Sequence, residues 1–143
     1  MTVVLWADEP ARVAAWVAGQ FAHVDGFPPW ARAVGWVRVG EDGAGEIIGG
    51  VVACPRGGDF DAELSIALDG VRTTRAHWRD LFGLCFDEWG WVRLTCHVAK
   101  QNKRARGFVE RLGFRREGAM RRAYDGRQTA IIYGMTRDEC RWI

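Results

Sequence analysis

Apolar residues recur at helical spacing in three stretches of the chain, and each stretch carries its own start or stop signal. These stretches cover residues 7–21, 73–90 and 102–113. In the first, Asp8 is placed to cap a helix and Pro10 suits its first turn. Gly90 ends the second stretch, whereas Asn102 opens the third and Gly113 ends it. The pattern therefore predicts three amphipathic helices.

Other stretches show the alternation, or the short apolar runs, of β-strands. They cover residues 33–40, 45–55, 60–68 and 91–98, and two more flank an Asp-Gly pair within 114–136. A loop rich in turn residues joins the first two into a hairpin, and the Asp-Gly pair indicates a second hairpin. The order helix, hairpin, strand, helix, strand, helix, hairpin is typical of an α/β protein with a mixed sheet, not of a doubly wound parallel sheet.

Size and composition limit the class of protein. A chain of 143 residues, 48% of them apolar and eight of them tryptophan, predicts a single domain over residues 1–143 with a substantial core. The net charge is only +2, from 20 basic and 18 acidic residues. This balance argues against nucleic acid as a partner, although the basic stretch 100–127 keeps association with a polyanion open as a minor alternative.

The four cysteines are widely separated and form no CxxC pair, so we interpret them as free thiols in a reducing compartment. The first six residues lack the basic start and long apolar core of a signal peptide. No apolar run reaches the roughly 18 residues of a membrane span. We therefore expect a cytoplasmic protein that does not act at a membrane.

One long segment has a recognisable order of motifs. In "VRLTCHVAKQNKRARGFVERLGFRREGAMRRAY" a strand leads to Asn102-x-x-Ala105, then a short helix, then a Gly-Phe pair that opens the next strand. This order resembles the C-terminal half of the GNAT superfamily of N-acetyltransferases. The ending "LGFRREG" and the tail "IIYGMTRDECRW" look most like the branch of ribosomal-protein N-terminal acetyltransferases. The likeness is good over residues 92–135, fair over 61–90 and weak before residue 50.

The resemblance implies an α/β fold with a mixed, mostly antiparallel sheet, a splayed pair of parallel strands and flanking helices. The splayed strands would be "AELSIAL" and "RLTCHV", with the pantetheine arm of acetyl-CoA hydrogen-bonded to the first of them as if it were a further strand. The backbone groups for this arm and for the thioester oxygen would come from Leu64, Ser65, Ile66 and Ala67. From the residues alone, the same strand could be a core strand without a ligand.

The loop expected to hold the pyrophosphate departs from the superfamily motif Q/R-x-x-G-x-G/A, whose glycines expose backbone N–H groups at a helix start. Here the segment reads "RTTRAH", so both glycines are replaced. The ligand-binding side chains implied are Arg72, Thr73, Thr74 and Arg75 at this loop, Asn102 beside the cofactor arm, and Arg104 and Arg106 near its phosphates or adenine. Asn102 is equally suited to cap its helix. Either these side chains compensate for the glycines, or the site binds CoA weakly or not at all.

Acetyl transfer needs a neutral amine and a proton for the departing thiolate. The resemblance makes Glu63 the first choice for the general base, directly or through water, and Asp61 on the same strand face a weaker candidate. From the residues alone, Glu63 could equally be an exposed charge near a strand end. Ser65, also on this face, is a candidate donor to the thiolate.

The resemblance also places Val109 where many members carry a tyrosine acid. Cys96 and Tyr133 are interpreted as core residues. His97 lies on the polar phase of its strand, which could face the substrate, and is interpreted as an ordinary surface or packed histidine. No set of side chains has metal-ligand spacing.

The resemblance therefore implies an enzyme: an acetyl-CoA-dependent N-acetyltransferase without a metal, in which a primary amine attacks directly within a ternary complex. The acceptor would be a small molecule or a peptide, held by the first helix, residues 23–35 and the final hairpin. A homodimer is compatible with this interpretation. The alternative is a non-catalytic module of the same fold that binds CoA or a partner, which the missing glycines and tyrosine favour.

Overall fold

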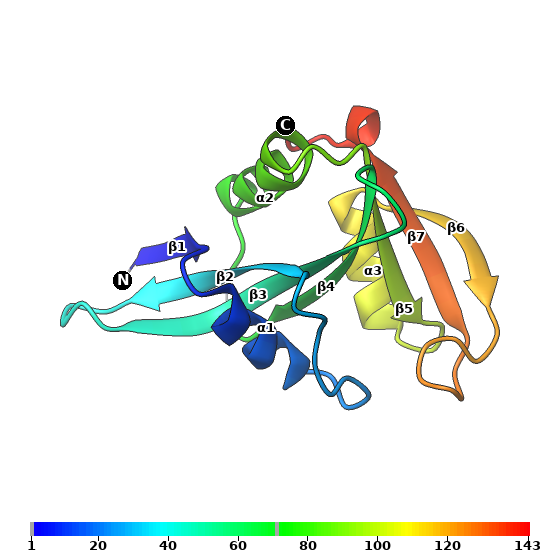
Figure 1. Cartoon of the computed structure of the whole chain (residues 1–143), viewed down its shortest axis with the longest axis horizontal. Coiled ribbons are helices and arrows are strands. Elements are labelled where there is room, and N and C mark those ends of the chain that lie inside the picture. Colours follow the sequence, from blue (N-terminus) through cyan, green and yellow to red (C-terminus); the bar gives the residue numbers. More distant parts are fainter. Residues whose placement is uncertain (1, 71) are drawn as a thin grey trace.

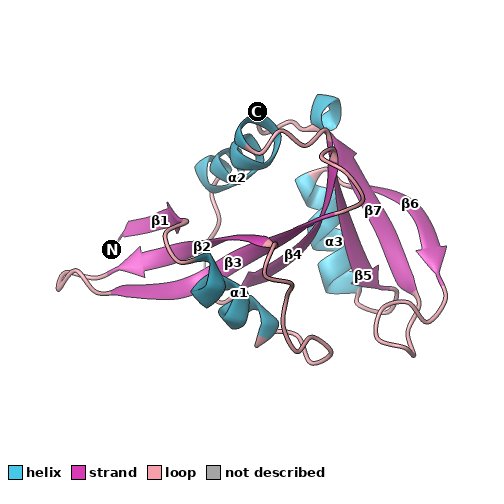
Figure 2. Cartoon of the chain, in the orientation of Figure 1, coloured by secondary structure: helices cyan, strands magenta, loops and turns pink. Residues whose placement is uncertain are grey.

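A computed structural model describes residues 2–70 and 72–143 of the chain (Figure 1). Within these residues lie three α-helices, seven strands and two short helical segments of other kinds, coloured by type in Figure 2. In chain order they are β1 (Thr2–Trp6), α1 (Pro10–Ala18), β2 (Arg32–Val39), β3 (Gly45–Pro55), β4 (Asp61–Leu68), α2 (Arg75–Gly83), the π-helical η1 (Leu84–Glu88), β5 (Arg93–Ala99), α3 (Lys103–Leu112), β6 (Arg115–Met120), β7 (Ala130–Thr136) and the 3-10 helical η2 (Arg137–Glu139). The predicted succession of helices and strands is confirmed, and β1 is added to it.

The strands form one sheet in the order β1-β2-β3-β4-β5-β7-β6. All neighbours run antiparallel except β4 and β5, the only parallel pair among the strands that the structure describes. Figure 1 shows α1 and α2 on opposite sides of the first half of the sheet, with α3 beside β5. The predicted α/β fold with a mixed, mostly antiparallel sheet is therefore confirmed.

The parallel pair is joined at one end only. Its register partners are Asp61 with Arg93, Ala62 with Leu94, and Glu63 with Thr95. Beyond these three positions β4 continues to Leu68 and β5 to Ala99, but the two strands no longer pair. They diverge in Figure 1, with the gap opening toward the lower part of the view. The predicted splayed pair is thus confirmed.

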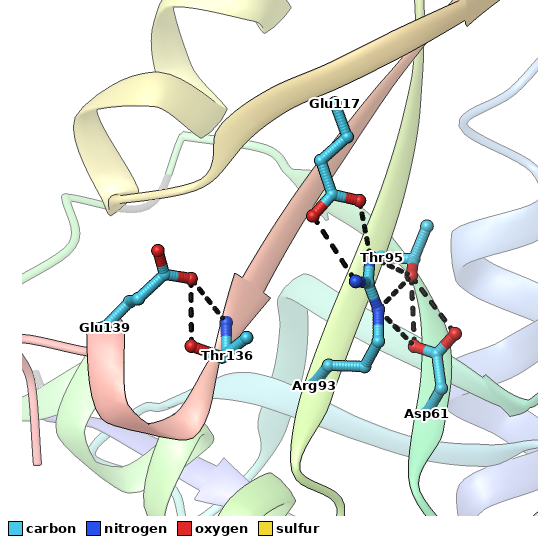
Figure 3. A network of polar contacts seen from close by, with 6 residues as sticks. All are labelled: Asp61, Arg93, Thr95, Glu117, Thr136 and Glu139. Carbon is cyan, nitrogen blue, oxygen red and sulfur yellow. Dashed lines mark hydrogen bonds and ion pairs between the residues drawn. The ribbon is translucent and has the colours of Figure 1, made fainter.

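A polar cluster holds the joined end of this pair, and we call its members Asp61, Arg93, Thr95 and Glu117 the clamp (Figure 3). The Arg93 guanidinium donates to Glu117 at 2.8 Å and to the Thr95 hydroxyl at 3.1 Å. The Thr95 hydroxyl donates to Asp61 at 3.0 Å. The hydrogen bond to Glu117 is the main reason that the pKa of Arg93 is raised. Because these residues come from β4, β5 and β6, the clamp fixes where the two parallel strands meet.

Apolar side chains pack on both faces of the sheet. On the side of α2 and α3 the core includes Trp36, Trp78, Phe82, Leu94 and Tyr133. A smaller cluster under α1 consists of Val13, Val17, Ala33, Val52 and Ala67. The alternation predicted for β5 is confirmed at Leu94, Cys96 and Val98, which are buried. Val92 has the same phase as these residues in the sequence, but it precedes the strand and is 55% exposed.

Of the three α-helices that the structure describes, two begin at a residue whose side chain caps them. Asn102 accepts a hydrogen bond from the Ala105 N–H at 3.0 Å and so caps α3, which Gly113 ends in the left-handed conformation. Thr74 caps α2. The prediction that Asp8 caps α1 is wrong: the helix begins at Pro10, and the N-cap residue Glu9 makes no side-chain cap.

Sequence analysis did not predict β1, which pairs with β2 at the edge of the sheet. Its five residues "TVVLW" are a short apolar run without polar alternation. Such a run carries no periodicity that separates a strand from a helical turn. The pairing partner, far along the chain, therefore decides the conformation.

The four cysteines are free, and all lie within the described residues. Burial raises the pKa of the Cys85 thiol to about 12, and it raises the pKa of Cys96 further above its ordinary value. Cys96 is 3% exposed, so its interpretation as a core residue is confirmed. In the part of the chain described, no helix has the length and apolar character required to cross a membrane.

Candidate active site

The backbone of β4 has an open edge where β5 leaves it. The Arg56 N–H donates to the Asp61 carbonyl, and the Asp69 N–H donates to the Ile48 carbonyl, so odd-numbered residues of β4 bond to β3. In an antiparallel pair this direction alternates along the strand. The N–H and C=O of Ile66 therefore point away from β3, toward the gap, where β5 no longer pairs with β4.

A cavity of about 600 Å³ lies at this gap. Its walls are formed by residues 63–66 of β4, residues 96–98 of β5 and the first turns of α3, together with loop residues from 21 to 27 and the turn at 123–124. The predicted residues Glu63, Leu64, Ser65, Ile66 and Asn102 thus share one cavity. The loop after α1 and the final hairpin also line it, as expected for the acceptor pocket, whereas α1 itself does not.

Glu63 and His97 meet across the gap. The Nδ1 of His97 lies 2.8 Å from Oε1 of Glu63, and the two side chains are 20% and 35% exposed. The hydrogen bond from His97 is the main cause that lowers the pKa of Glu63, and it outweighs the burial that would raise it. The opposite ring nitrogen, Nε2, is buried and makes no hydrogen bond within the residues described. Glu63 is therefore an ionised carboxylate bound to an imidazole, and not an isolated base.

Glu63 is a predicted site residue, whereas His97 was interpreted from the sequence as an ordinary surface or packed histidine on the polar phase of its strand. The sequence did contain one signal for the pair, the alternation of side chains along each strand. Both residues lie on the face of their strand opposite the buried positions Leu64 and Cys96. The contact also requires the parallel register that pairs Glu63 with Thr95. That register cannot be read from either strand alone.

This pair predicts a change in the acid stability of the protein. A carboxylate whose pKa is lowered by folding stabilises the protein above its unfolded pKa, near 4.5, and this stabilisation is lost as the pH falls through the lower folded pKa. Glu63→Gln removes the titration. We expect the free energy of unfolding to fall less steeply below about pH 4.5 in the variant than in the wild type. Urea titrations between about pH 6 and 3 measure both slopes, and parallel slopes would contradict the prediction.

Ser65 and Ala67 of β4 are also predicted site residues, and only the first of them lines the cavity. Ser65 lines the cavity, so its hydroxyl is available as a donor there. Ala67 does not line it: its side chain is buried in the cluster under α1, and its odd position directs its backbone groups toward β3. A role for Ser65 in protonating the thiolate stays a prediction, as does contact between Ala67 and a cofactor.

In the loop before α2, His77 replaces a glycine of the superfamily motif and takes part in capping the helix. The Thr74 hydroxyl accepts from the His77 N–H, and His77 Nδ1 accepts from the Thr74 N–H at 3.0 Å. Two backbone donors that a glycine-rich loop would offer to a ligand are therefore occupied. Arg72 is exposed and Thr73 is half-buried. Arg75 lies over the Trp142 ring at 5.9 Å. These residues stand outside the cavity, and their contact with phosphate stays a prediction.

At the start of α3, the side chains predicted to bind the cofactor differ in how many hydrogen bonds they already make within the protein. Asn102 lines the cavity while its side-chain oxygen caps the helix, which leaves its amide NH₂ as the group for a ligand. Arg104 is exposed. Arg106 donates to the Tyr133 hydroxyl at 3.2 Å and to the Lys100 carbonyl at 3.0 Å. Arg106 therefore has structural partners, and phosphate binding by Arg104 or Arg106 stays a prediction.

Comparisons with protein-family models and with curated proteins found no match. Solved structures do match. A chimera of spermidine N-acetyltransferase SpeG from Vibrio cholerae and hSSAT superposes with a TM-score of 0.69 at 16% identity, over 96% of this chain and 98% of the other. The GNAT-family acetyltransferase from Bacillus anthracis gives 0.61 at 17% identity, over 75% and 67%, and a probable acetyltransferase gives 0.64 at 18%, over 96% and 94%. The chain has the GNAT fold.

In this GNAT fold, two loops that line the cavity contact each other through aromatic rings. The ring of His23, after α1, lies 4.3 Å from the ring of Tyr124, in the loop between β6 and β7. Burial is the main reason that the pKa of Tyr124 is raised, so its phenol stays protonated at neutral pH. Tyr124, whose hydroxyl is a hydrogen-bond donor, is thereby part of the cavity wall. Within the described residues, no group of three or more histidines, cysteines or carboxylates could hold a metal ion.

Proposed function

We propose that this protein is an acetyl-CoA-dependent N-acetyltransferase that acts on a primary amine. One observation carries the proposal: β4 and β5 separate after three paired positions and leave an open strand edge beside a cavity of about 600 Å³. An extended amide chain can hydrogen-bond to such an edge as a further strand. The same cavity holds a carboxylate–imidazole pair, which suits the handling of protons.

The open edge fits the pantetheine arm, which contains amide groups. Ile66 offers an N–H and a carbonyl on that edge, and Leu64, two residues earlier, has the same phase. Acetyl-CoA would supply an acetyl group activated as a thioester. The N–H of Ile66 would stabilise the negative charge that develops on the carbonyl oxygen. Beyond the cavity, the phosphates would bind to Arg72, Arg75 and Arg104, which are exposed near the starts of α2 and α3.

The charge of the cavity supports a cationic acceptor. Its walls include the carboxylates of Asp25 and Glu63, and within the described residues they include no lysine or arginine. The chain as a whole has more basic than acidic residues, so the excess of acidic side chains in the cavity wall does not follow from the overall composition. An ammonium group is stabilised beside carboxylates and aromatic faces, and Phe27 and Tyr124 provide such faces. Small-molecule amines and peptide N-termini, including those of ribosomal proteins, are the acceptor classes that we propose.

A second candidate is a module that keeps the fold and binds CoA without catalysis. The capping of α2 by Thr74 and His77 favours it, because the backbone donors are occupied. Two measurements separate the candidates: calorimetry with CoA and acetyl-CoA, and thiol release from acetyl-CoA with a panel of mono- and diamines and short peptides. Turnover with any amine supports the enzyme. Binding without turnover supports the module, and absence of both overturns the proposal.

Replacing Arg72 tests whether the loop before α2 binds phosphate. We expect Arg72→Ala to weaken acetyl-CoA binding by about fivefold, the effect of one exposed charged contact of about 1 kcal/mol. Arg79→Ala is the matched control, because Arg79 is an exposed arginine of α2 itself, more than a turn from the start of the helix. Calorimetry at two salt concentrations measures both variants. Equal affinities for the two variants would show that Arg72 does not contact the ligand.

A further inference from the structure

We propose that His97 accepts the proton of the acceptor amine at Nε2, and that Glu63 is a positioning residue that holds the imidazole. The inference rests on the proposed function and assigns the roles within its site. It departs from the sequence-based expectation that Glu63 itself is the base. Three features carry it: the register of the sheet, the direction of the hydrogen bond, and the surroundings of Nε2.

The sheet brings the two side chains together at the point where the strands part. Glu63 is the last residue of β4 that pairs with β5, and its partner is Thr95. His97 lies two residues further along β5, so its side chain emerges on the same face as that of Thr95. It reaches back to Glu63 at 2.8 Å. The pair therefore spans the mouth of the gap, beside the open edge at Ile66.

The hydrogen bond fixes which ring nitrogen is basic. A carboxylate can only accept, so Nδ1 of His97 must carry the proton that it donates to Glu63. In the neutral ring Nε2 then has a free lone pair. Nε2 is buried without a partner in the described structure, and leaving such an atom unsatisfied is unfavourable. A donor N–H that reaches this atom would satisfy it, and the acceptor ammonium is the donor that this reaction brings.

Glu63 is poorly suited to take the proton itself. Its oxygen already accepts from His97, and the pKa of its carboxyl is lowered by that bond. A side-chain ammonium has a reference pKa of about 10.4, whereas free imidazole is near 6.5 and a glutamate near 4.3. Proton transfer to a carboxylate of lowered pKa is more uphill than transfer to an imidazole. Glu63 acts instead by stabilising the imidazolium that forms, as a carboxylate does for the base in serine hydrolases.

The proton balance is simple. The acceptor ammonium gives one proton to Nε2 of His97, and its nitrogen lone pair then forms a bond to the thioester carbonyl carbon. As the carbon–sulfur bond breaks, the remaining excess proton of the nitrogen goes to the thiolate. The products are an amide and a free thiol, and the His97 imidazolium releases its proton to solvent. No oxidant, reductant or covalent enzyme intermediate is needed.

Kinetics with matched variants test the assignment. We expect His97→Asn and His97→Ala to lower kcat by about 100-fold, with the KM for acetyl-CoA within about threefold of wild type. Added imidazole should restore part of the activity of His97→Ala and should not stimulate the wild type. Glu63→Gln should lower kcat by about tenfold and shift the pH–rate profile, because the imidazolium loses its carboxylate. Glu46→Gln, an exposed glutamate at the far end of β3, is the control.

A second readout does not depend on activity or on the variants folding. Nitrogen NMR of the wild-type protein labelled at histidine reports which ring nitrogen is protonated. We expect His97 to carry its proton on Nδ1. His77 is an internal reference of opposite type, because its Nδ1 accepts from the Thr74 N–H and its proton must lie on Nε2. An Nε2–H form of neutral His97 would overturn the inference.

The outcomes separate this inference from the proposed function. A wild-type enzyme that transfers acetyl groups, with His97→Asn retaining a third or more of its kcat, overturns the role of His97 and leaves the function standing. A wild type that transfers to no amine overturns both. Loss of turnover with acetyl-CoA binding retained by calorimetry, and rescue by imidazole, supports the inference.

Discussion

Replacing Ile66 by proline is expected to lower acetyl transfer by at least about 100-fold, the effect of removing one donor from an oxyanion site. Proline has no N–H, and the Ile66 N–H faces the gap beyond the last position at which β4 pairs with β5. The N–H is not part of the β3–β4 ladder, so its loss removes no hydrogen bond from the fold. Proline is tolerated in strands at such open positions. Steady-state assays of thiol release measure the effect.

Two control variants, one at Ile66 itself and one at the next residue, make this experiment specific. Ile66→Val keeps the N–H and a β-branched side chain, so we expect activity within about threefold of wild type. Ala67→Pro breaks a bond to β3 and introduces a ring into the cluster under α1, so it should lower the unfolding free energy by about 3 kcal/mol. If Ile66→Pro is folded and transfers acetyl groups as fast as Ile66→Val, the open edge does not bind the thioester.

Local signals in the sequence predicted the elements on which the site is built. The alternation of "RLTCHV" defined β5 because one face of that strand is buried against α3 and the other is polar. Asn102 and Gly113 marked the ends of α3 because the missing backbone partners at helix ends are supplied by near neighbours. Such signals depend on residues three or four positions apart.

The chemistry of the site depends on contacts that no local signal contains. Glu63 and His97 are 34 positions apart, and their meeting follows from a parallel register of three residues. The motif comparison gave Glu63 a role because it considered β4 by itself, and it left His97 without one. In the same way, His77 was considered only as a residue that replaces a glycine. Its side chain proves to cap α2, which changes what the loop before that helix can offer to a phosphate.

Asp61→Ala is expected to lower the free energy of unfolding by about 2–3 kcal/mol, because it removes one member of the clamp from a site with little solvent. The Asp61 side chain is 14% exposed, and it accepts the hydroxyl of Thr95, which is 2% exposed. Its removal leaves that buried hydroxyl without its acceptor and leaves Glu117 as the one carboxylate of the clamp bound to Arg93. Urea unfolding followed by tryptophan fluorescence measures the loss.

Glu117→Ala is the matched control, because it removes the other carboxylate bound to Arg93. Glu117 is 42% exposed, so solvent replaces much of what it provides, and we expect a loss below about 1 kcal/mol. The difference between the two variants isolates what burial adds at the joined end of β4 and β5. Equal losses would mean that the charge of Arg93, and not the hydrogen bond across the parallel pair, holds this end of the gap. A larger loss for Asp61→Ala ties the stability of the fold to the point from which the cavity opens.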